Sequence, residues 1–138
     1  MIEYRENAAI QLDDLLNLYV DAGWSSYTDK PDKFKYAHDN SLYCMSAWEG
    51  SELAGLIRVV GDGASIVYVQ DLLVKTGYRR QGIGKRLLNR VLAHFSGIRQ
   101  FVLITDNTLD TKRFYESCSM RALEDYNCRA FVRYNLDA

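Results

Sequence analysis

The sequence contains little cysteine, and the pattern of its cysteines argues against both a disulfide framework and a zinc site. Cysteine stands only at positions 44, 118 and 128. These three are odd in number and show no C-x-x-C spacing, so we expect reduced thiols in a cytoplasmic protein. The two histidines, His38 and His94, lie far from any cysteine pair. We therefore expect no bound metal.

Long apolar runs and a strong net charge are also missing. No apolar run approaches the roughly 20 residues that span a bilayer, and the charged N-terminal stretch lacks the apolar core of a secretory signal. The formal net charge is −1, so the chain has no overall positive charge that would attract nucleic acid or an anionic membrane. We expect neither as a partner. One proline and nine glycines leave no long linker, so residues 1–138 are predicted to form a single domain.

The spacing of apolar residues predicts an alternation of helices and strands. Helical periodicity covers 11–20, 31–40, 83–95 and 108–118. Pro31 suits the first turn of the second of these helices, with Asp29 as a cap before it. Strand patterns cover 42–48, 53–60, 65–74, 98–105 and 128–136. The first three strands are joined by short turns, which predicts an antiparallel meander. The next helix and strand complete a β-α-β unit with a parallel pair, so the fold class is α/β with a mixed sheet.

A basic, glycine-containing turn precedes the helix at 83–95. It reads Arg79-Arg80-Gln81-Gly82-Ile83-Gly84-Lys85. The first turn of a helix has backbone N–H groups without partners, and these together with the helix dipole suit a phosphate. Two phosphate motifs are excluded by spacing. A Walker A loop requires lysine and then serine or threonine after its second glycine, and a dinucleotide fingerprint requires glycine where Leu87 stands. A plain turn with a solvated basic rim remains the alternative.

The same turn resembles the acyl-CoA signature [QR]-x-x-G-x-[GA] of the GNAT N-acetyltransferase superfamily. It matches at 79–84, and DLLVKTGYRRQGIGKRLL (71–88) is similar to that family's strand, pyrophosphate loop and helix. The resemblance implies a GNAT-like fold with helices on both faces of the sheet. It also implies that acetyl-CoA is the acyl donor, with its pyrophosphate on the backbone amides of about 80–85. The strand at 65–74 is expected to splay from the strand at 98–105, leaving the backbone of Leu73 and Val74 for the pantetheine arm.

The resemblance also implies catalytic groups. FYES (114–117) is similar to the family's second signature and makes Tyr115 the expected general acid for the CoA thiolate. Thr108 stands where the family often has asparagine, with Asn107 beside it, and Asn107 or Thr108 is expected to contact the cofactor. Asp71 is the one acid on the strand at 65–74 and is a hypothesis for the general base. It could instead hold a neighbouring backbone group or an arginine, with water taking the proton. The resemblance places the base of better-studied relatives at the position of Tyr68 or Gln70 rather than Asp71, and strand alternation puts these two residues on the face opposite Asp71.

In this family the acceptor pocket is usually built from the first two helices and their connection. Trp24, Tyr27 and Tyr36 are therefore expected to line it, with core packing as the alternative for each aromatic. The function predicted is acetyl transfer to a small-molecule amine or a protein amino group through a ternary complex. A CoA-binding sensor without efficient catalysis is the alternative. The oligomeric state stays open, with a homodimer as one arrangement.

Overall fold

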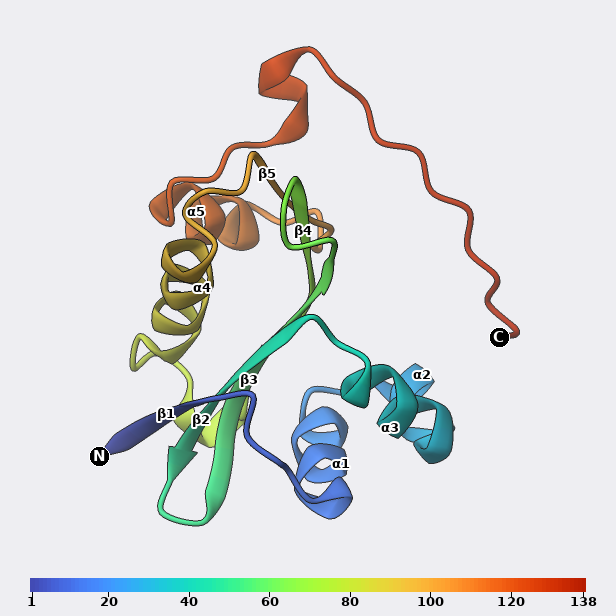
Figure 1. Cartoon of the computed structure of the whole chain (residues 1–138), viewed down its shortest axis with the longest axis vertical. Helices are drawn as coiled ribbons and strands as arrows, with labels where there is room; N and C mark the ends of the chain where they lie inside the picture. The colour runs from blue at the N-terminus through green and yellow to red at the C-terminus, as the bar shows by residue number, and fades with distance from the viewer. The chain divides into compact units, whose positions relative to one another are not determined.

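A five-stranded mixed sheet organises residues 1–104 in a computed structural model that describes residues 1–138 (Figure 1). The strands lie in sequence order and comprise β1 (Ile2–Glu6), β2 (Tyr43–Glu49), β3 (Glu52–Gly61), β4 (Ile66–Val74) and β5 (Gln100–Leu103). The first four pair antiparallel, and β4 pairs with β5 in parallel. The predicted meander and β-α-β unit are confirmed. β1 was not predicted, although Ile2 and Tyr4 alternate with charged residues as a strand requires.

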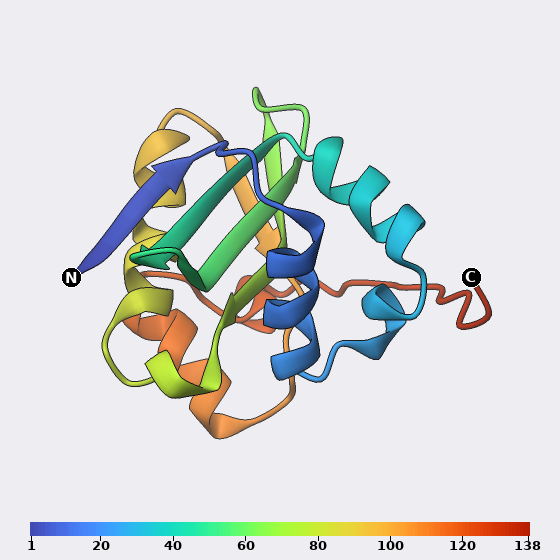
Figure 2. The same cartoon turned by 90° about the horizontal axis from the view of Figure 1, so that it is seen from below.

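Helices cover both faces of this sheet (Figure 2). They are α1 (Leu12–Asp21), α2 (Ser25–Thr28), α3 (Pro31–Asp39) and α4 (Ile83–His94). α1 and α3 share a buried cluster with Leu56 of β3. The neighbouring Gly55 faces α4, because a Cβ built there would lie 3.3 Å from Cγ2 of Ile83. Consecutive strand residues point to opposite faces, so the two contacts assign the helices to the two sides. None of the helices has the length and apolar character needed to cross a bilayer.

Two details of the helical region differ from expectation. The connection between the first two predicted helices contains the short helix α2. The cap of α3 is Lys30 rather than Asp29, and no side chain caps that helix. Pro31 at the first helical position needs no partner for a backbone N–H, which lowers the number of groups a cap must satisfy.

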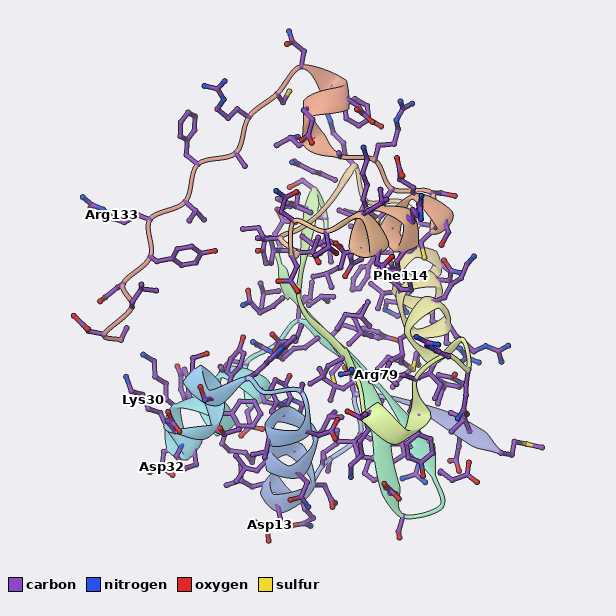
Figure 3. The ribbon with its side chains drawn as sticks, turned by 180° about the vertical axis from the view of Figure 1, so that it is seen from behind. Asp13, Lys30, Asp32, Arg79, Phe114 and Arg133 are labelled. Carbon is purple, nitrogen blue, oxygen red and sulfur yellow. The ribbon has the colours of Figure 1, made fainter.

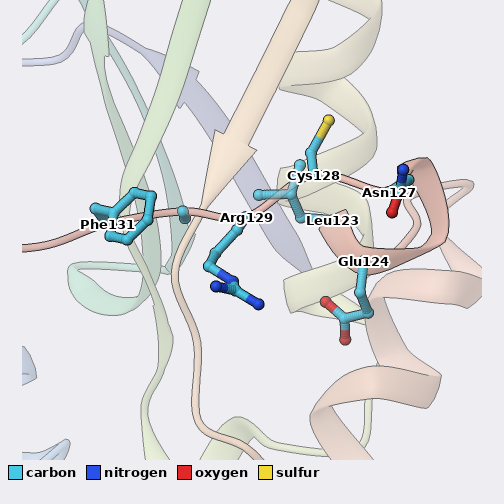
Figure 4. Close-up of a pocket in the computed structure, with 7 residues that line it drawn as sticks. Leu123, Glu124, Asn127, Cys128, Arg129 and Phe131 are labelled. Atoms are coloured by element: carbon cyan, nitrogen blue, oxygen red, sulfur yellow. The ribbon is translucent and has the colours of Figure 1, made fainter.

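Residues 105–138 form a second compact unit. It contains α5 (Leu109–Ser117) and a 3-10 turn, η2 (Leu123–Tyr126). The predicted strand at 128–136 is wrong, because this segment has no regular structure. Its alternation is real, but a strand also needs a neighbouring strand to bond its backbone, and none pairs with it. Phe131 and Leu136 are 88% and 86% exposed. A hollow within this unit is lined by Leu123, Glu124, Asn127, Cys128, Arg129, Ala130 and Phe131 (Figure 4).

Candidate functional site

The turn before α4 presents open backbone N–H groups. Gly82 is the N-cap residue with φ of 80°, and no side chain caps the helix. The first intrahelical bond runs from Arg86 N to Gly82 O at 3.0 Å. The N–H groups of 83–85 therefore have no acceptor in the helix. A Cβ built on Gly82 would meet no atom within 4 Å, so the approach to these donors is open. This arrangement suits an anion at the positive end of the helix.

Basic side chains surround this turn. Arg79, Arg80 and Lys85 are all exposed. Arg79 donates through Nε to the carbonyl of Val74 at 3.3 Å, which holds its backbone turn against the end of β4 (Figure 3). Arg80 has φ of 65°, a left-handed conformation that costs a non-glycine residue energy. Strained backbone often occurs at binding sites, and here it lies two residues before the helix cap.

Two acidic side chains fix the segment between β4 and the basic turn. Asp21, at the end of α1, accepts from the backbone N and the hydroxyl of Thr76 at 2.8 and 3.0 Å. Glu52 accepts from the hydroxyl of Tyr78 at 3.2 Å and pairs with Lys75 at 3.3 Å. The segment at 75–78, which leads into the basic turn, is therefore tied to α1 and β3 by side-chain contacts.

The second half of β4 has a strand neighbour on one side only. Pairing with β5 covers Ile66 to Val69, opposite Gln100 to Leu103, and stops there. On the other side, β3 continues alongside β4 to the pair Gly55 and Val74. Residues 70–74 thus keep one open flank that leads directly into the basic turn. The splay of the two parallel strands predicted from the resemblance is present.

Alternation along β4 decides which backbone groups face that flank. Lys75 N donates to Ala54 O at 2.8 Å, so Lys75 directs its N–H toward β3. Backbone groups of alternate residues in an antiparallel strand point to the same side. Leu73 therefore also faces β3, whereas Leu72 and Val74 face the open flank. Of the two residues expected to hold the pantetheine arm, Val74 directs its backbone groups to the open flank, whereas Leu73 directs them to β3.

A β-bulge interrupts β4 at the start of the open flank. Arg58 lies opposite Asp71, but Val59 lies opposite Val69, which leaves Gln70 without a partner on β3. Such an extra residue reverses the side-chain alternation beyond it. Tyr68 lies opposite Val60, two residues from Arg58, and so shares a face with Asp71. The expectation that Tyr68 points away from Asp71 is wrong, because it assumed a regular strand.

Asp71 lies at the centre of a buried polar network. Its side chain is 2% exposed, and its partner Arg58 is 5% exposed. Oδ2 accepts from Nε of Arg58 and from the hydroxyl of Tyr19, each at 2.8 Å. Oδ1 accepts from the hydroxyl of Tyr27 at 2.9 Å. Both carboxylate oxygens are thus occupied by donors from the protein. The arginine partner corresponds to the alternative role considered for Asp71.

The same network shifts the ionisation of its members. Burial, and then the Asp71 charge, raises the pKa of Tyr19 well above its usual value. The same two causes raise the pKa of Tyr27. Burial works against the charge on Arg58, but Asp71 outweighs it and raises the pKa of the guanidinium. Both phenols therefore stay protonated at neutral pH and keep donating to the carboxylate.

Comparison with known proteins identifies the family. The model of the acetyltransferase (GNAT) family matches residues 10–120. A GNAT family acetyltransferase from Streptococcus pneumoniae is 36% identical, with a TM-score of 0.87 and 98% of each chain covered. The chain belongs to the GNAT family of acetyltransferases. Glucosamine-6-phosphate N-acetyltransferase from Arabidopsis thaliana has the same fold at 15% identity, with a TM-score of 0.69 and 98% and 99% of the two chains covered. A search of curated protein sequences finds no match.

Among GNAT proteins of known structure, an aminoglycoside N-acetyltransferase in complex with CoA also shares the fold. It is 14% identical, with a TM-score of 0.72 and coverage of 98% of this chain and 95% of that chain. At this identity the likeness shows the fold alone. Which acceptor this GNAT protein uses is therefore a separate question.

The three aromatics expected at the GNAT acceptor pocket differ in their surroundings. Trp24 and Tyr27 are half-buried and pack with Tyr19, whose ring centroid lies 5.6 and 5.3 Å from theirs. Tyr36 is 70% exposed and belongs to no such cluster. Arg58 and Tyr19 were not singled out from the sequence. An arginine within the apolar run LAGLIRVV was the one available signal for a buried ion pair.

The remaining expected residues lie in the second unit. Tyr115 is half-buried on α5, and burial is the main reason its pKa is raised. A hydrogen bond with Thr105 acts in the opposite direction. Thr108 is the N-cap of α5 and accepts from Thr111 N at 3.2 Å, which explains why a threonine stands there. Asn107 is exposed beside it.

Proposed function

We propose that this GNAT protein transfers an acetyl group from acetyl-CoA to an amine. One relationship supports this most directly. The open flank of β4 at 70–74 continues into a turn whose glycine cap exposes the N–H groups at the start of α4. A long ligand with a phosphate at one end and an amide-rich arm matches these two features. The arm would bond to backbone that has no strand partner on that side, and the phosphate would take the helix terminus.

The basic turn supplies the rest of the phosphate site. Arg79, Arg80 and Lys85 add charge around the backbone donors, so their contacts with phosphate would be charge-assisted. Gln81, Gly82, Ile83 and Gly84 contribute through the backbone. In this proposal the glycine brings the donors close, and the cations mainly raise the affinity.

Acetyl-CoA supplies a thioester carbon open to attack. The amine nitrogen forms the new C–N bond, the C–S bond breaks, and the amine loses one proton to water. Tyr115 is the proposed donor of the proton that the leaving thiolate takes up, since its raised pKa keeps the phenol protonated at neutral pH. Asp71 has no free oxygen for an amine proton, so we propose that it positions Tyr27 and Arg58 and does not act as the base.

Acceptor identity is tested by a thiol-release screen with acetyl-CoA. The panel contains sisomicin, glucosamine 6-phosphate, spermidine, free amino acids and lysine-containing peptides. Turnover of any amine above the rate of hydrolysis supports the enzyme and names its acceptor class. Binding of acetyl-CoA by calorimetry, without turnover of any member, would favour the CoA-binding sensor instead.

A further inference from the structure

The strand β1 leaves one edge of the sheet unpaired. It is the first strand in the sheet order, and β2 is its one strand neighbour (Figure 2). Asn7 N donates to Cys44 O of β2 at 2.7 Å, so the carbonyl of the preceding Glu6 points away from β2. Backbone groups of alternate residues in a strand point to the same side, so Ile2 and Tyr4 also direct theirs to the open edge. Such an edge can accept another strand.

The charges of β1 are arranged symmetrically about Tyr4. Glu3 and Arg5 flank it on one face of the sheet, where their side chains are 66% and 38% exposed. In an antiparallel pair of β1 strands with Tyr4 opposite Tyr4, Glu3 of each copy lies opposite Arg5 of the other, which stabilises the pair. Centres at Glu3, Arg5 or Glu6 put like charges opposite each other. A centre at Ile2 leaves most of β1 unpaired.

The other face of β1 is complementary in the same register. The Cζ atoms of Arg86 and Arg90 lie 5.8 and 4.8 Å from the ring centroid of Tyr4. Neither arginine forms an ion pair within the chain. Glu6 of the second copy lies diagonal to Tyr4, within reach of long side chains. Oε1 of Glu6 accepts from the Tyr43 hydroxyl at 2.6 Å, which leaves Oε2 for the arginines across the edge.

We propose that two copies of this chain associate through their β1 edges, antiparallel and centred on Tyr4, so that the two sheets become continuous. The contact is symmetric, since the same strand serves on both sides. Ile2, Tyr4 and Glu6 each exchange two backbone hydrogen bonds with the second copy. The shared edge is short, so we expect a reversible dimer with a Kd of about 1–100 μM. This association goes beyond the proposed acetyl transfer and does not depend on it.

The test measures self-association by sedimentation velocity over a concentration series. Wild type should show a monomer–dimer equilibrium. Glu3→Arg and Arg5→Glu each place like charges opposite each other at both symmetric contacts, and each should raise the dimer Kd at least about tenfold. An equimolar mixture of the two variants should form a heterodimer with about the wild-type Kd, because every contact again joins opposite charges. The Glu3–Arg5 bond within each chain stays broken in that mixture, so the recovery cannot come from it.

A charge reversal elsewhere on the chain is the matched control. Lys35→Glu disrupts the exposed pair with Asp39 on α3 and should dimerise as wild type does. Wild type that stays monomeric up to millimolar concentration overturns the inference. A dimer of equal strength in wild type, Glu3→Arg and Arg5→Glu also overturns it, because that dimer would use another surface. A mixture of the two variants that remains monomeric overturns the pairing centred on Tyr4.

Discussion

Gln70 and Asp71 are neighbours in sequence, yet both hydrogen-bond to the hydroxyl of Tyr27, at 3.1 and 2.9 Å. Consecutive residues in a regular strand point to opposite faces and could not reach one atom. The bulge at Gln70 removes this restriction. Through these two bonds Tyr27, which follows α1, contacts β4 at the point where β4 and β5 separate. The bulge therefore fixes a polar group, the Gln70 side chain, beside the open flank of β4.

Removing one member of the buried Arg58–Asp71 pair should lower the free energy of unfolding strongly, whereas replacing both members with apolar residues should lower it much less. Arg58→Met leaves the Asp71 carboxylate buried beside two phenols without its cation, and should lower the free energy of unfolding by about 3–5 kcal/mol. The double variant Arg58→Met, Asp71→Leu removes both charges and should recover most of this loss. Urea denaturation of the two single variants and the double variant measures the coupling. Additive losses in the double variant would contradict a direct ion pair.

The sequence predicted this region unevenly, for physical reasons. The basic turn and the β-α-β unit depend on local spacing, and both are present. The bulge arises from how β4 pairs with β3, so nothing in SIVYVQDLLV indicates it. The predicted orientation of the Tyr68 side chain was wrong for that reason. The strand predicted at 128–136 failed for a related cause. Alternation shows that a segment has the side-chain pattern of a strand, but whether it joins a sheet depends on a partner strand that is distant in sequence.

Gly82→Trp should weaken CoA binding by at least about tenfold. The substitution places a large side chain over the open N–H groups of 83–85, in a backbone conformation that disfavours non-glycine residues. Gly77→Trp is the matched control, because Gly77 also has open space around it but does not have a positive φ. Calorimetry with CoA on both variants checks the prediction. An equal loss of affinity in the two variants would point to general crowding of the turn.

The three thiols should differ sharply in reactivity. Cys44 and Cys118 are buried, and burial raises the pKa of the Cys44 thiol to about 12. Cys128 is exposed. Because the thiolate is the reacting species, a disulfide reagent at pH 8 should label one thiol per chain quickly and all three only in denaturant. Cys128→Ser should abolish the fast reaction. Two or more fast thiols in the native protein would contradict the burial of Cys44 or Cys118.

Alkaline pH should reveal the burial of the Tyr19 phenol beside the Asp71 carboxylate, which together raise its pKa. The pKa of Tyr19 is raised in the folded state, so its contribution to stability is complete below about pH 10, the value for an unfolded tyrosine, and is lost as pH rises through the folded value. The free energy of unfolding should therefore fall less steeply above pH 10 in Tyr19→Phe than in wild type. Tyr36→Phe, at a ring that is 70% exposed, is the control and should follow wild type.

Tyr115→Phe should lower kcat by about 10²- to 10⁴-fold, the usual contribution of a general acid, once the screen supplies an acceptor. The phenyl ring keeps the packing of α5 but cannot protonate the thiolate, so the Kd for CoA should not change. Tyr126→Phe in the same unit is the control, since that ring is 64% exposed. Stopped-flow measurement of thiol release under single-turnover conditions isolates the chemical step. A normal single-turnover rate would exclude Tyr115 as the acid and leave water to protonate the thiolate.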